Sequence, residues 1–210
     1  VTGAAGYIGS ILVPRLLDKG HEVIALDSFM YNQTSLLDCC HNESLSVVNG
    51  DARDQSLVSG LLKGVDAIFP LACLTGAPLC AKDPIAAKST NFEAVKMLLE
   101  LRSKEQRIIF PTTNSGYGVG EKGKYCTEET PMRPVSLYAK LKVEVEKILL
   151  DSENTMTFRF ATIFGTSPRM RIDLLVNDFT YRAVNDRFLV LFEAHFKRNY
   201  LHVRDAAGAF

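Results

Sequence analysis

The stretch Val1–Gly9 reads V-T-G-A-A-G-Y-I-G, and it decides the fold class. Gly3, Gly6 and Gly9 recur at every third position after what reads as the end of a β-strand, and an apolar pattern with helical spacing follows at once. A strand, a glycine turn and a helix place free backbone N–H groups and the positive end of the helix dipole around a dinucleotide pyrophosphate. The glycines allow the tight turn, the close approach to phosphate and the close contact between helix and strand. The pattern therefore predicts nucleotide binding.

An acidic residue follows the glycines at the distance that dinucleotide binding requires. The apolar run Val23–Leu26 predicts a second strand, and this strand ends in Asp27. A carboxylate about 20 residues after the glycines is placed to accept hydrogen bonds from ribose hydroxyls. Asp27 repels a 2′-phosphate, and Ser28–Met30 contains no arginine that would accept one. The sequence therefore favours NAD over NADP. Without Asp27 and the second strand, the glycine spacing alone would also fit a purely structural turn.

Apolar strands alternate with helical patterns along the chain. Several strands are nearly continuous apolar runs, which is typical of strands covered on both faces. The alternation indicates an α/β protein with a Rossmann-type, doubly wound parallel sheet and right-handed crossovers. Only residues 1 and 2 precede the glycine turn, so we expect the natural chain to begin earlier. Strands are predicted at Val23–Leu26, Leu45–Asn49, Ala67–Leu71, Arg107–Pro111 and Met156–Phe160, and helices at Tyr7–Lys19, Gln55–Lys63, Ile85–Ser103 and Ser136–Asp151.

Composition narrows the classes of function. The 210 residues carry a formal net charge of zero, which gives no sign of a nucleic-acid partner or an anionic membrane surface. No apolar run reaches membrane-spanning length, and no signal-peptide pattern opens the chain. The 5 cysteines lack C-x-x-C spacing, which predicts reduced thiols in the cytoplasm rather than disulfides or a metal site. Cys73 fits a nucleophile or, more simply, a small buried hydrophobe.

Ligands of doubly wound sheets bind beyond the carboxyl ends of the strands. Asp51 follows the predicted third strand, where it would accept a hydrogen bond from an adenine amino group or, equally well, cap the next helix. Leu71 and Ala72 end the predicted fourth strand, where small residues would let the backbone pass the cofactor or simply pack. These strand ends are the predicted edge of the cofactor site.

A possible proton-transfer pair lies on the helix predicted after the fifth strand. Tyr138 and Lys142 are four residues apart and share one helix face. A phenol has a pKa near 10, and a nearby ammonium stabilises the phenolate and lowers that pKa. The pair would then take a proton from a sugar hydroxyl as hydride leaves the same carbon, with Thr113 orienting the substrate oxygen. Alternatively, Tyr138 is exposed and Lys142 is solvated.

Eight short motifs occur in a recognisable order across nearly the whole chain. They are T-G-A-A-G-Y-I-G at Thr2–Gly9, Asp27, G-D-A-R-D at Gly50–Asp54, Asn91 in D-P-I-A-A-K-S-T-N, F-P-T-T-N-S-G-Y-G at Phe110–Gly118, Y-A-K-L-K at Tyr138–Lys142, R-F-A-T-I-F-G at Arg159–Gly165 and R-N-Y-L-H-V-R-D at Arg198–Asp205. In these motifs the chain resembles the extended short-chain dehydrogenase/reductases, specifically the NAD-dependent nucleotide-sugar epimerase/dehydratase group.

The resemblance implies roles for individual residues. Tyr138 would be the catalytic acid/base, Lys142 its partner and a ribose ligand, and Thr113 the hydroxyl helper. Asn91 would support the active-site helix, and the backbone of Arg159–Gly165 would cradle the nicotinamide. The expected contacts to NAD are Gly3, Gly6, Tyr7, Ile8, Gly9, Asp27, Asp51, Ala52, Leu71, Ala72, Tyr138 and Lys142.

The chain also departs from the family pattern. Dehydratases of the group carry an Asp-Glu pair directly after the Ser/Thr, whereas this chain has Asn114-Ser115, so sugar dehydration of the usual kind is not expected. Thr162 stands where many epimerases have an asparagine that contacts substrate. Arg171 and Arg198 are candidates for the substrate diphosphate, because guanidinium matches phosphate geometry, or are solvated surface residues. Asn114, Ser115, Arg171 and Arg198 are thus the predicted substrate contacts.

Together these observations predict an NAD-dependent epimerase that acts on a nucleotide-activated sugar through a transient keto intermediate. The alternatives are a net NAD(P)-dependent reductase, dehydrogenase or dehydratase, and a non-catalytic dinucleotide-binding fragment. Residues 1–165 would form the NAD-binding domain with the catalytic residues, and residues 166–210 the start of a truncated substrate lobe. By resemblance, we expect a homodimer through the helices at Ile85–Ser103 and Ser136–Asp151.

Overall fold

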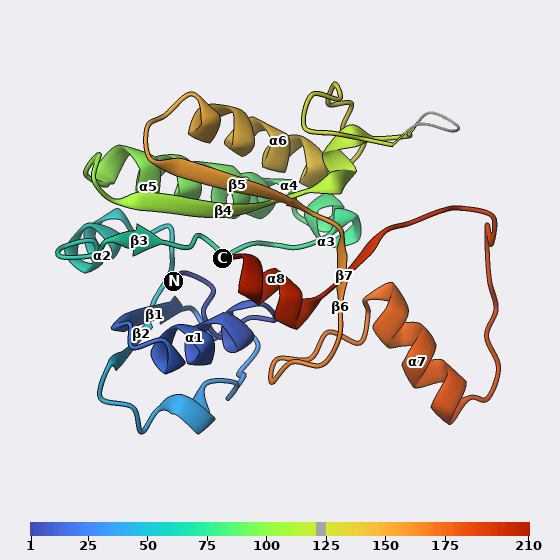
Figure 1. Ribbon diagram of the computed structural model, residues 1–210, viewed down its shortest axis with the longest axis horizontal. Coiled ribbons are helices and arrows are strands. Elements are labelled where there is room, and N and C mark those ends of the chain that lie inside the picture. Colours follow the sequence, from blue (N-terminus) through green and yellow to red (C-terminus); the bar gives the residue numbers. More distant parts are fainter. Residues whose placement is uncertain (121–124) are drawn as a thin grey trace.

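The structure, a computed structural model, describes residues 1–120 and 125–210 and is an α/β fold (Figure 1). Among these residues every paired strand runs parallel to its neighbour. One sheet pairs β1 with β2, a second has the order β3-β4-β5, and a third pairs β6 with β7. The strands are β1 (Val23–Asp27), β2 (Leu45–Asn49), β3 (Ala67–Ile68), β4 (Arg107–Thr113), β5 (Thr155–Phe160), β6 (Thr162–Phe164) and β7 (Tyr200–His202). The α-helices are α1 (Gly9–Asp18), α2 (Gln55–Leu61), α3 (Ala77–Lys82), α4 (Pro84–Lys88), α5 (Ala94–Leu101), α6 (Leu137–Leu150), α7 (Leu175–Asn185) and α8 (Val203–Ala209).

Thr2 joins the first two sheets. It forms parallel bridges to Leu26 on one side and to Pro70 on the other, and its N–H donates to the Phe69 carbonyl at 3.0 Å. The strand order is therefore β2-β1-Thr2-β3-β4-β5, which confirms the predicted doubly wound sheet. The direction of winding reverses between Thr2 and β3, and ligands of such sheets bind at the carboxyl ends of the strands at this point.

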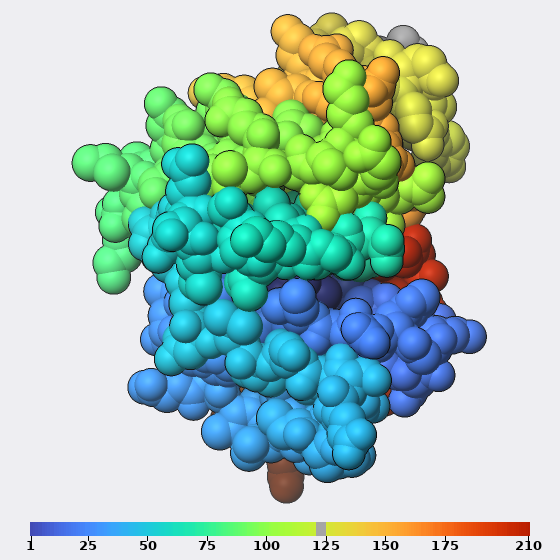
Figure 2. Space-filling model, turned by 90° about the vertical axis from the view of Figure 1, so that its left-hand side faces the viewer, coloured from blue at the N-terminus to red at the C-terminus, as the bar shows by residue number. Residues whose placement is uncertain are grey.

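Both faces of the sheet are covered by helices. Side chains alternate along β4, so Ile108 and Phe110 pack with Val145 of α6 while Ile109 packs on the other face with Leu12 of α1. The first core also takes residues from α2 and α5, and the second takes residues from α8. Seen from the side, the blue and cyan N-terminal residues lie below the green and orange residues of the later elements (Figure 2).

The predicted helix at Ile85–Ser103 is interrupted. It consists of α4, a π-helical turn η2 (Ser89–Glu93) and α5. Such π turns inside helices are often found at functional sites. The predicted strand at Ala67–Leu71 is also shorter, because regular pairing of β3 covers only Ala67–Ile68 and Pro70 has no N–H to donate. The sequence did not predict α3, α7, α8, β6 or β7.

The last residues return to the main sheet. The strand β7 pairs with β6, and α8 packs against α1 (Figure 1). The ring of Phe210 meets Phe69 and Phe158 edge-on at centroid distances of 5.8 Å. Between α7 and β7 the chain runs along the outside of the molecule with most side chains exposed. The division into residues 1–165 and 166–210 stays a prediction.

Among the residues that the structure describes, no helix is long and apolar enough to cross a membrane. In the same ranges, no group of three or more histidine, cysteine, aspartate and glutamate side chains is placed to hold a metal ion.

Candidate active site

Steric constraint explains two of the three glycines in the loop before α1. A Cβ on Gly9 would overlap the Ala4 carbonyl and lie 2.5 Å from the Gly3 oxygen, and a Cβ on Gly3 would lie 2.6 Å from Ala72 N. Gly3 also has a φ of +64°, which disfavours other residues. A Cβ on Gly6 would lie 3.0 Å from the Gly3 oxygen, a less severe approach than those at Gly3 and Gly9. The loop is therefore closely packed backbone, and its contact with a pyrophosphate stays a prediction.

Asp27 fixes the shape of this loop. Its carboxylate is buried, accepts a hydrogen bond from Ala5 N at 2.9 Å and accepts a second from Phe29 N at 2.9 Å. The side chain of Gln33 donates to the same carboxylate at 3.2 Å. Because each carboxylate oxygen has two lone pairs, Asp27 retains acceptor capacity for a ribose hydroxyl. The ribose contact itself stays a prediction.

The other predicted cofactor contacts lie at strand ends as expected. Leu71 N and Ala72 N donate to the Thr2 carbonyl and hydroxyl at 3.0 and 3.2 Å, which brings the end of β3 against the glycine loop. Asp51 does not cap α2, because Asp54 does so by accepting from Leu57 N at 3.1 Å.

Instead, Asp51 pairs with Arg53, and this hydrogen-bonded guanidinium lowers the pKa of its carboxyl group. Ala52 is buried in the main core. The structure therefore places Asp51 beyond β2 as an ionised acceptor, while its contact with adenine stays a prediction.

Helix α6 carries Tyr138 and Lys142 toward the end of β4. Ser136 begins the helix by accepting a hydrogen bond from Ala139 N at 3.2 Å. The Lys142 side chain is only 4% exposed, and its Nζ donates to the Pro111 carbonyl at 2.9 Å. The same ammonium lies 4.2 Å from the centre of the Phe110 ring. The alternative of a solvated lysine is therefore wrong.

Lys142 was expected to lower the pKa of Tyr138, but in the structure that pKa is raised. Burial raises the pKa of Tyr138 well above its ordinary value, and Arg171 is the cation whose charge opposes this rise. Burial also lowers the pKa of Lys142. The physical reason is desolvation, because the charged form of each group loses water in this cluster. Without a ligand, Tyr138 is therefore a neutral phenol at neutral pH.

Thr113 ends β4 and begins the short helix η3 (Asn114–Tyr117). Its hydroxyl accepts a hydrogen bond from Ser115 N at 3.2 Å. Glycine makes the approach of η3 to α6 possible, because a Cβ on Gly116 would lie 2.9 Å from Val143 Cγ2 of α6. The sequence therefore brings Thr113 and the helix of Tyr138 together at one end of the sheet.

An ion pair that the sequence analysis missed ties α6 to its neighbours. Arg159 of β5 donates to the Glu146 carboxylate through Nε at 2.7 Å, and to the Tyr117 hydroxyl at 3.0 Å. Glu146 is 3% exposed and lies on the same helix face as Lys142, one turn further on. The guanidinium also donates to the Glu128 carbonyl at 2.8 Å. One arginine thus connects α6, β5, η3 and the segment before α6.

Asn91 occupies the π turn η2 and is 1% exposed. Its side-chain oxygen accepts from Leu74 N at 2.8 Å, and its amide donates to the Leu74 carbonyl at 2.9 Å. The amide therefore satisfies both backbone groups of a residue in the connection between β3 and α3. This contact supports the structural role that the resemblance implies for Asn91.

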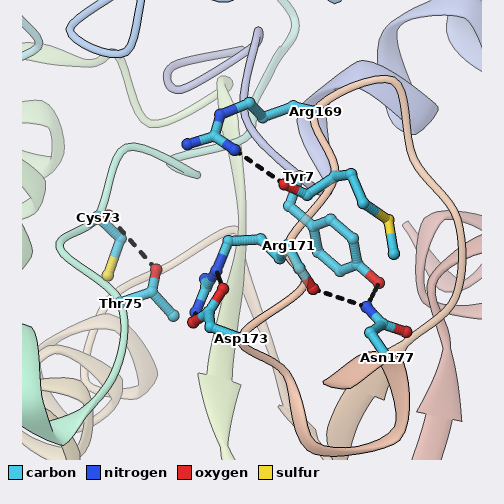
Figure 3. A network of polar contacts seen from close by, with 8 residues as sticks. Tyr7, Cys73, Thr75, Arg169, Arg171, Asp173 and Asn177 are labelled. Carbon is cyan, nitrogen blue, oxygen red and sulfur yellow. Dashed lines mark hydrogen bonds and ion pairs between the residues drawn. The ribbon is translucent and has the colours of Figure 1, made fainter. Parts of the chain in front are cut away.

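A second connection missed in the sequence lies between the glycine loop and the segment after β6. The Tyr7 hydroxyl donates to the Gly165 carbonyl at 2.6 Å, and the Ser167 hydroxyl donates to the Tyr7 carbonyl at 2.7 Å. Asn177 of α7 accepts from Gly165 N at 2.9 Å and donates to the Tyr7 hydroxyl at 3.3 Å (Figure 3). Arg169 lies over the Tyr31 ring, 4.6 Å from its centre, and so reaches the loop after Asp27.

The predicted substrate contacts do not all come together. Arg171 is held by both oxygens of Asp173 at 2.7 and 2.6 Å, and its guanidinium points to the side where Cys73 and Thr75 lie (Figure 3). Arg198 is exposed on the outer segment, although its neighbour Asn199 accepts a hydrogen bond from Asn114 at 2.6 Å. Ser115 is exposed at the end of β4.

Comparison with known proteins agrees with this geometry. The model of the NAD dependent epimerase/dehydratase family matches residues 1–210. The chain belongs to this family. It is 30% identical over 223 residues to a Bacillus subtilis protein described as an uncharacterized UDP-glucose epimerase, covering 98% of this chain and 68% of that protein. It is 29% identical to the UDP-glucose 4-epimerase of Lactobacillus helveticus, covering 80% of this chain and 52% of the relative.

Solved structures of the family share the fold. The dTDP-glucose 4,6-dehydratase of Streptomyces venezuelae, solved with NAD bound, is 27% identical with a TM-score of 0.85, covering 99% of this chain and 68% of that one. The UDP-N-acetylglucosamine 4-epimerase of Methanobrevibacter ruminantium superposes with a TM-score of 0.88 at 24% identity, over 99% of this chain and 69% of that one. Family members thus include both epimerases and dehydratases, and relatives of both kinds bind nucleotide sugars or NAD.

Proposed function

We propose that the protein epimerises a nucleotide-activated sugar through a transient keto sugar, with NAD as a bound cofactor. The observation that supports this proposal is the buried Lys142 of α6, whose ammonium bonds to Pro111 in β4, on the same helix as Tyr138 and beside the strand that ends in Thr113. This end of the sheet adjoins the winding reversal where the glycine loop lies. A proton-transfer group beside a dinucleotide cradle is what oxidation of a sugar hydroxyl requires.

The fit of the residues to NAD is supported by the glycine loop and by Asp27. Gly3 and Gly9 bring backbone close enough to leave no room for a side chain, and Asp27 retains acceptor capacity without a basic neighbour in Ser28–Met30. When bound there, NAD would accept and return a hydride and would place a positive charge beside the phenol. That charge would favour the phenolate form of Tyr138, which burial otherwise opposes.

The chain's own residues would then carry out the proton transfers. Tyr138 would take the proton of the sugar hydroxyl as the carbonyl forms and would return it when the carbonyl is reduced on the other face. Thr113 would donate a hydrogen bond to the sugar oxygen. Lys142 would hold the ribose and add its positive charge, since its ammonium has further donors besides the one bound to Pro111.

Epimerisation is favoured over dehydration by the two residues after Thr113. Eliminating water from a sugar needs one group that removes a proton from carbon and another that protonates the leaving hydroxyl. Asn114 and Ser115 supply no carboxylate there, and the amide of Asn114 is already engaged with Asn199. A homodimer through α4, α5 and α6 and a cytoplasmic location are part of the same proposal.

The test is incubation of the protein with UDP-, dTDP- and GDP-sugars, substoichiometric NAD and deuterated water. Epimerisation at the oxidised carbon predicts an epimer without deuterium on carbon and without net change in NADH absorbance. Dehydration would introduce solvent deuterium, and a reductase would consume coenzyme. We expect Tyr138→Phe to bind NAD normally but to lose about 10²- to 10⁴-fold in turnover. NAD binding without turnover on any sugar nucleotide would refute the proposal in favour of a binding module.

A further inference from the structure

Two thiols beside Lys142 share one hydrogen-bond acceptor. The Cys73 thiol lies 3.6 Å from the Leu74 carbonyl oxygen, and the Cys80 thiol donates to the same oxygen at 3.1 Å. The two sulfur atoms are therefore no farther apart than the sum of these two distances. Both cysteines are free thiols in the structure. Cys73 follows β3 and Cys80 lies in α3, so one short connection separates them.

The two thiols differ in access and surroundings. Cys80 is 0% exposed, and burial raises the pKa of its thiol. Cys73 is only half-buried, and its side chain lies on the side of the site toward which Arg171 points (Figure 3). The Cys73 thiol lies within hydrogen-bond reach of the Lys142 ammonium. This contact partly offsets the lowering of the Lys142 pKa by burial. Cys73 is therefore the residue of the pair that has exposed surface, and Cys80 has none.

We propose that Cys73 and Cys80 form a reversible modification site, a dithiol that a small disulfide such as glutathione disulfide oxidises to an intramolecular disulfide. The observation that carries this proposal is the pair of sulfur atoms on the Leu74 oxygen, one accessible and one buried. A disulfide needs its sulfur atoms at about 2.05 Å, so the connection between the two residues must close. Gly76 lies in that connection with a φ of +99°, a backbone conformation that glycine adopts freely, so the chain turns there.

The chemistry balances in two exchanges. Cys73 gives its proton to solvent, and its thiolate attacks one sulfur of glutathione disulfide, which forms a mixed disulfide and releases one glutathione thiolate. Cys80 then loses its proton to that thiolate, and its sulfur attacks the Cys73 sulfur. This releases the second glutathione as a thiolate, which takes a proton back from solvent. Two thiols of the protein are oxidised and one small disulfide is reduced to two thiols.

Closure of the disulfide would alter the wall of the candidate active site. Cys80 would leave the Leu74 oxygen and the Asn91 amide, which lies 3.6 Å from its sulfur. Cys80 packs in one cluster with Tyr138, and α3 contacts α6. We therefore expect the oxidised form to lose NAD affinity and turnover, and to regain both with dithiothreitol. The turnover part rests on the proposed function, whereas the disulfide itself does not.

The chain contains a matched control pair. Cys39 and Cys40 both donate to the Leu36 carbonyl oxygen at 3.2 Å, so they share an acceptor as Cys73 and Cys80 do. However, neighbouring Cα atoms are only about 3.8 Å apart across a trans peptide, which is shorter than disulfide geometry accommodates. We expect no disulfide within this pair, and only mixed disulfides at the exposed Cys40 and Cys126.

The experiment treats the native protein with glutathione disulfide, blocks the remaining thiols and digests with trypsin. Residues 64–82 form one tryptic peptide, and Cys73 and Cys80 are its only cysteines. We expect this peptide to be lighter than the dithiol form by two hydrogens. Cys80→Ser should stop at a glutathione adduct on Cys73, and Cys73→Ser should leave Cys80 reduced. NAD titration by calorimetry measures the consequence without any need for turnover.

Three results would overturn the proposal. One is a native protein that takes glutathione on Cys126 while peptide 64–82 stays reduced. Another is a disulfide in peptide 64–82 that forms only after urea unfolding. The third is unchanged NAD affinity in native protein whose peptide 64–82 has been converted fully to the disulfide. Failure of the proposed function would instead appear as missing turnover in the fully reduced protein.

Discussion

The glycine loop is shaped by its backbone, whereas the surroundings of α6 are held together by polar side chains. The loop gains its shape by excluding side chains, since a Cβ on Gly3 or Gly9 would overlap neighbouring backbone. Around α6 the opposite holds, because Lys142 and Glu146 are buried and each is held by a specific polar partner. The glycine loop should therefore be destabilised by added side-chain atoms. The surroundings of α6 should be destabilised by the removal of one polar partner.

The side-chain region offers the larger effect. Glu146→Gln removes the charge that balances Arg159 in a site where Glu146 is 3% exposed. Removing one partner of a buried pair leaves the other charge uncompensated, so we expect a loss of about 3 kcal/mol in the free energy of unfolding. Urea unfolding followed by circular dichroism measures this loss. Replacing both partners by apolar residues should cost less than either single change.

A matched control lies on α5. Lys96 and Glu100 form an ion pair at 3.7 Å with both side chains half-exposed or more. Exposed pairs of this kind contribute roughly 0.3–0.5 kcal/mol, so Glu100→Gln should have little effect. If Glu146→Gln and Glu100→Gln destabilise the protein equally, the buried pair does not hold α6 as the contacts suggest.

The sheet could be predicted from sequence because its signals are local. Glycines at Gly3, Gly6 and Gly9 and apolar runs such as Val23–Leu26 each identify an element without reference to distant residues. The parallel order followed from the alternation of strands and helices. In contrast, the π turn at η2 contains Asn91, which bonds to Leu74 in a distant connection, and no pattern within the helix indicates that contact.

The sequence predicted that Lys142 lies near the end of β4, where its ammonium bonds to Pro111, but it did not predict the electrostatics there. The joint roles of Thr113, Tyr138 and Lys142 stay predictions. The pKa of Tyr138 moves in the unexpected direction because burial depends on residues from α3 and the β3–α3 connection, which sequence spacing does not reveal. Asn177 was missed because it contacts Tyr7 across 170 residues, with no local motif.

The backbone region should be broken by single methyl groups. Gly9→Ala adds a Cβ against two carbonyl oxygens of the loop, and overpacking of this kind costs about 2 kcal/mol. We expect Gly9→Ala to lower the free energy of unfolding and NAD affinity together. A Cβ on Gly6 meets the Gly3 oxygen at 3.0 Å, so Gly6→Ala should lose less stability than Gly9→Ala. Because the proposed pyrophosphate lies against this loop, NAD affinity should fall in Gly6→Ala by more than its stability loss explains. Unfolding and calorimetric titration of both variants decide this, and normal NAD affinity in Gly6→Ala would place the pyrophosphate elsewhere.

The smallest expected effect is the change of stability with pH that the buried Tyr138 causes. Burial raises the pKa of Tyr138 above its ordinary value of 10.0. As the pH rises past 10, the unfolded chain loses this proton while the folded chain keeps it, so stability is present below that pH and falls above it. The slope for one such group is at most about 1.4 kcal/mol per pH unit. Lys142, whose pKa burial lowers, changes stability with the opposite sign, but only below its ordinary value of 10.5.

The free energy of unfolding should therefore be measured as a function of pH above 10.5. In that range Tyr138 still changes the stability with pH, whereas Lys142 no longer does. We expect the wild type to lose stability more steeply there than Tyr138→Phe, because phenylalanine has no proton to release. Tyr7→Phe serves as the control from the glycine loop, since burial raises the pKa of Tyr7 as well. In Tyr7→Phe the slope of unfolding free energy against pH should also become smaller, independently of Tyr138. The double variant should show the sum of the two changes. Parallel slopes in wild type and Tyr138→Phe would mean that the phenol is solvated, and the side-chain region would then be less enclosed than its packing indicates.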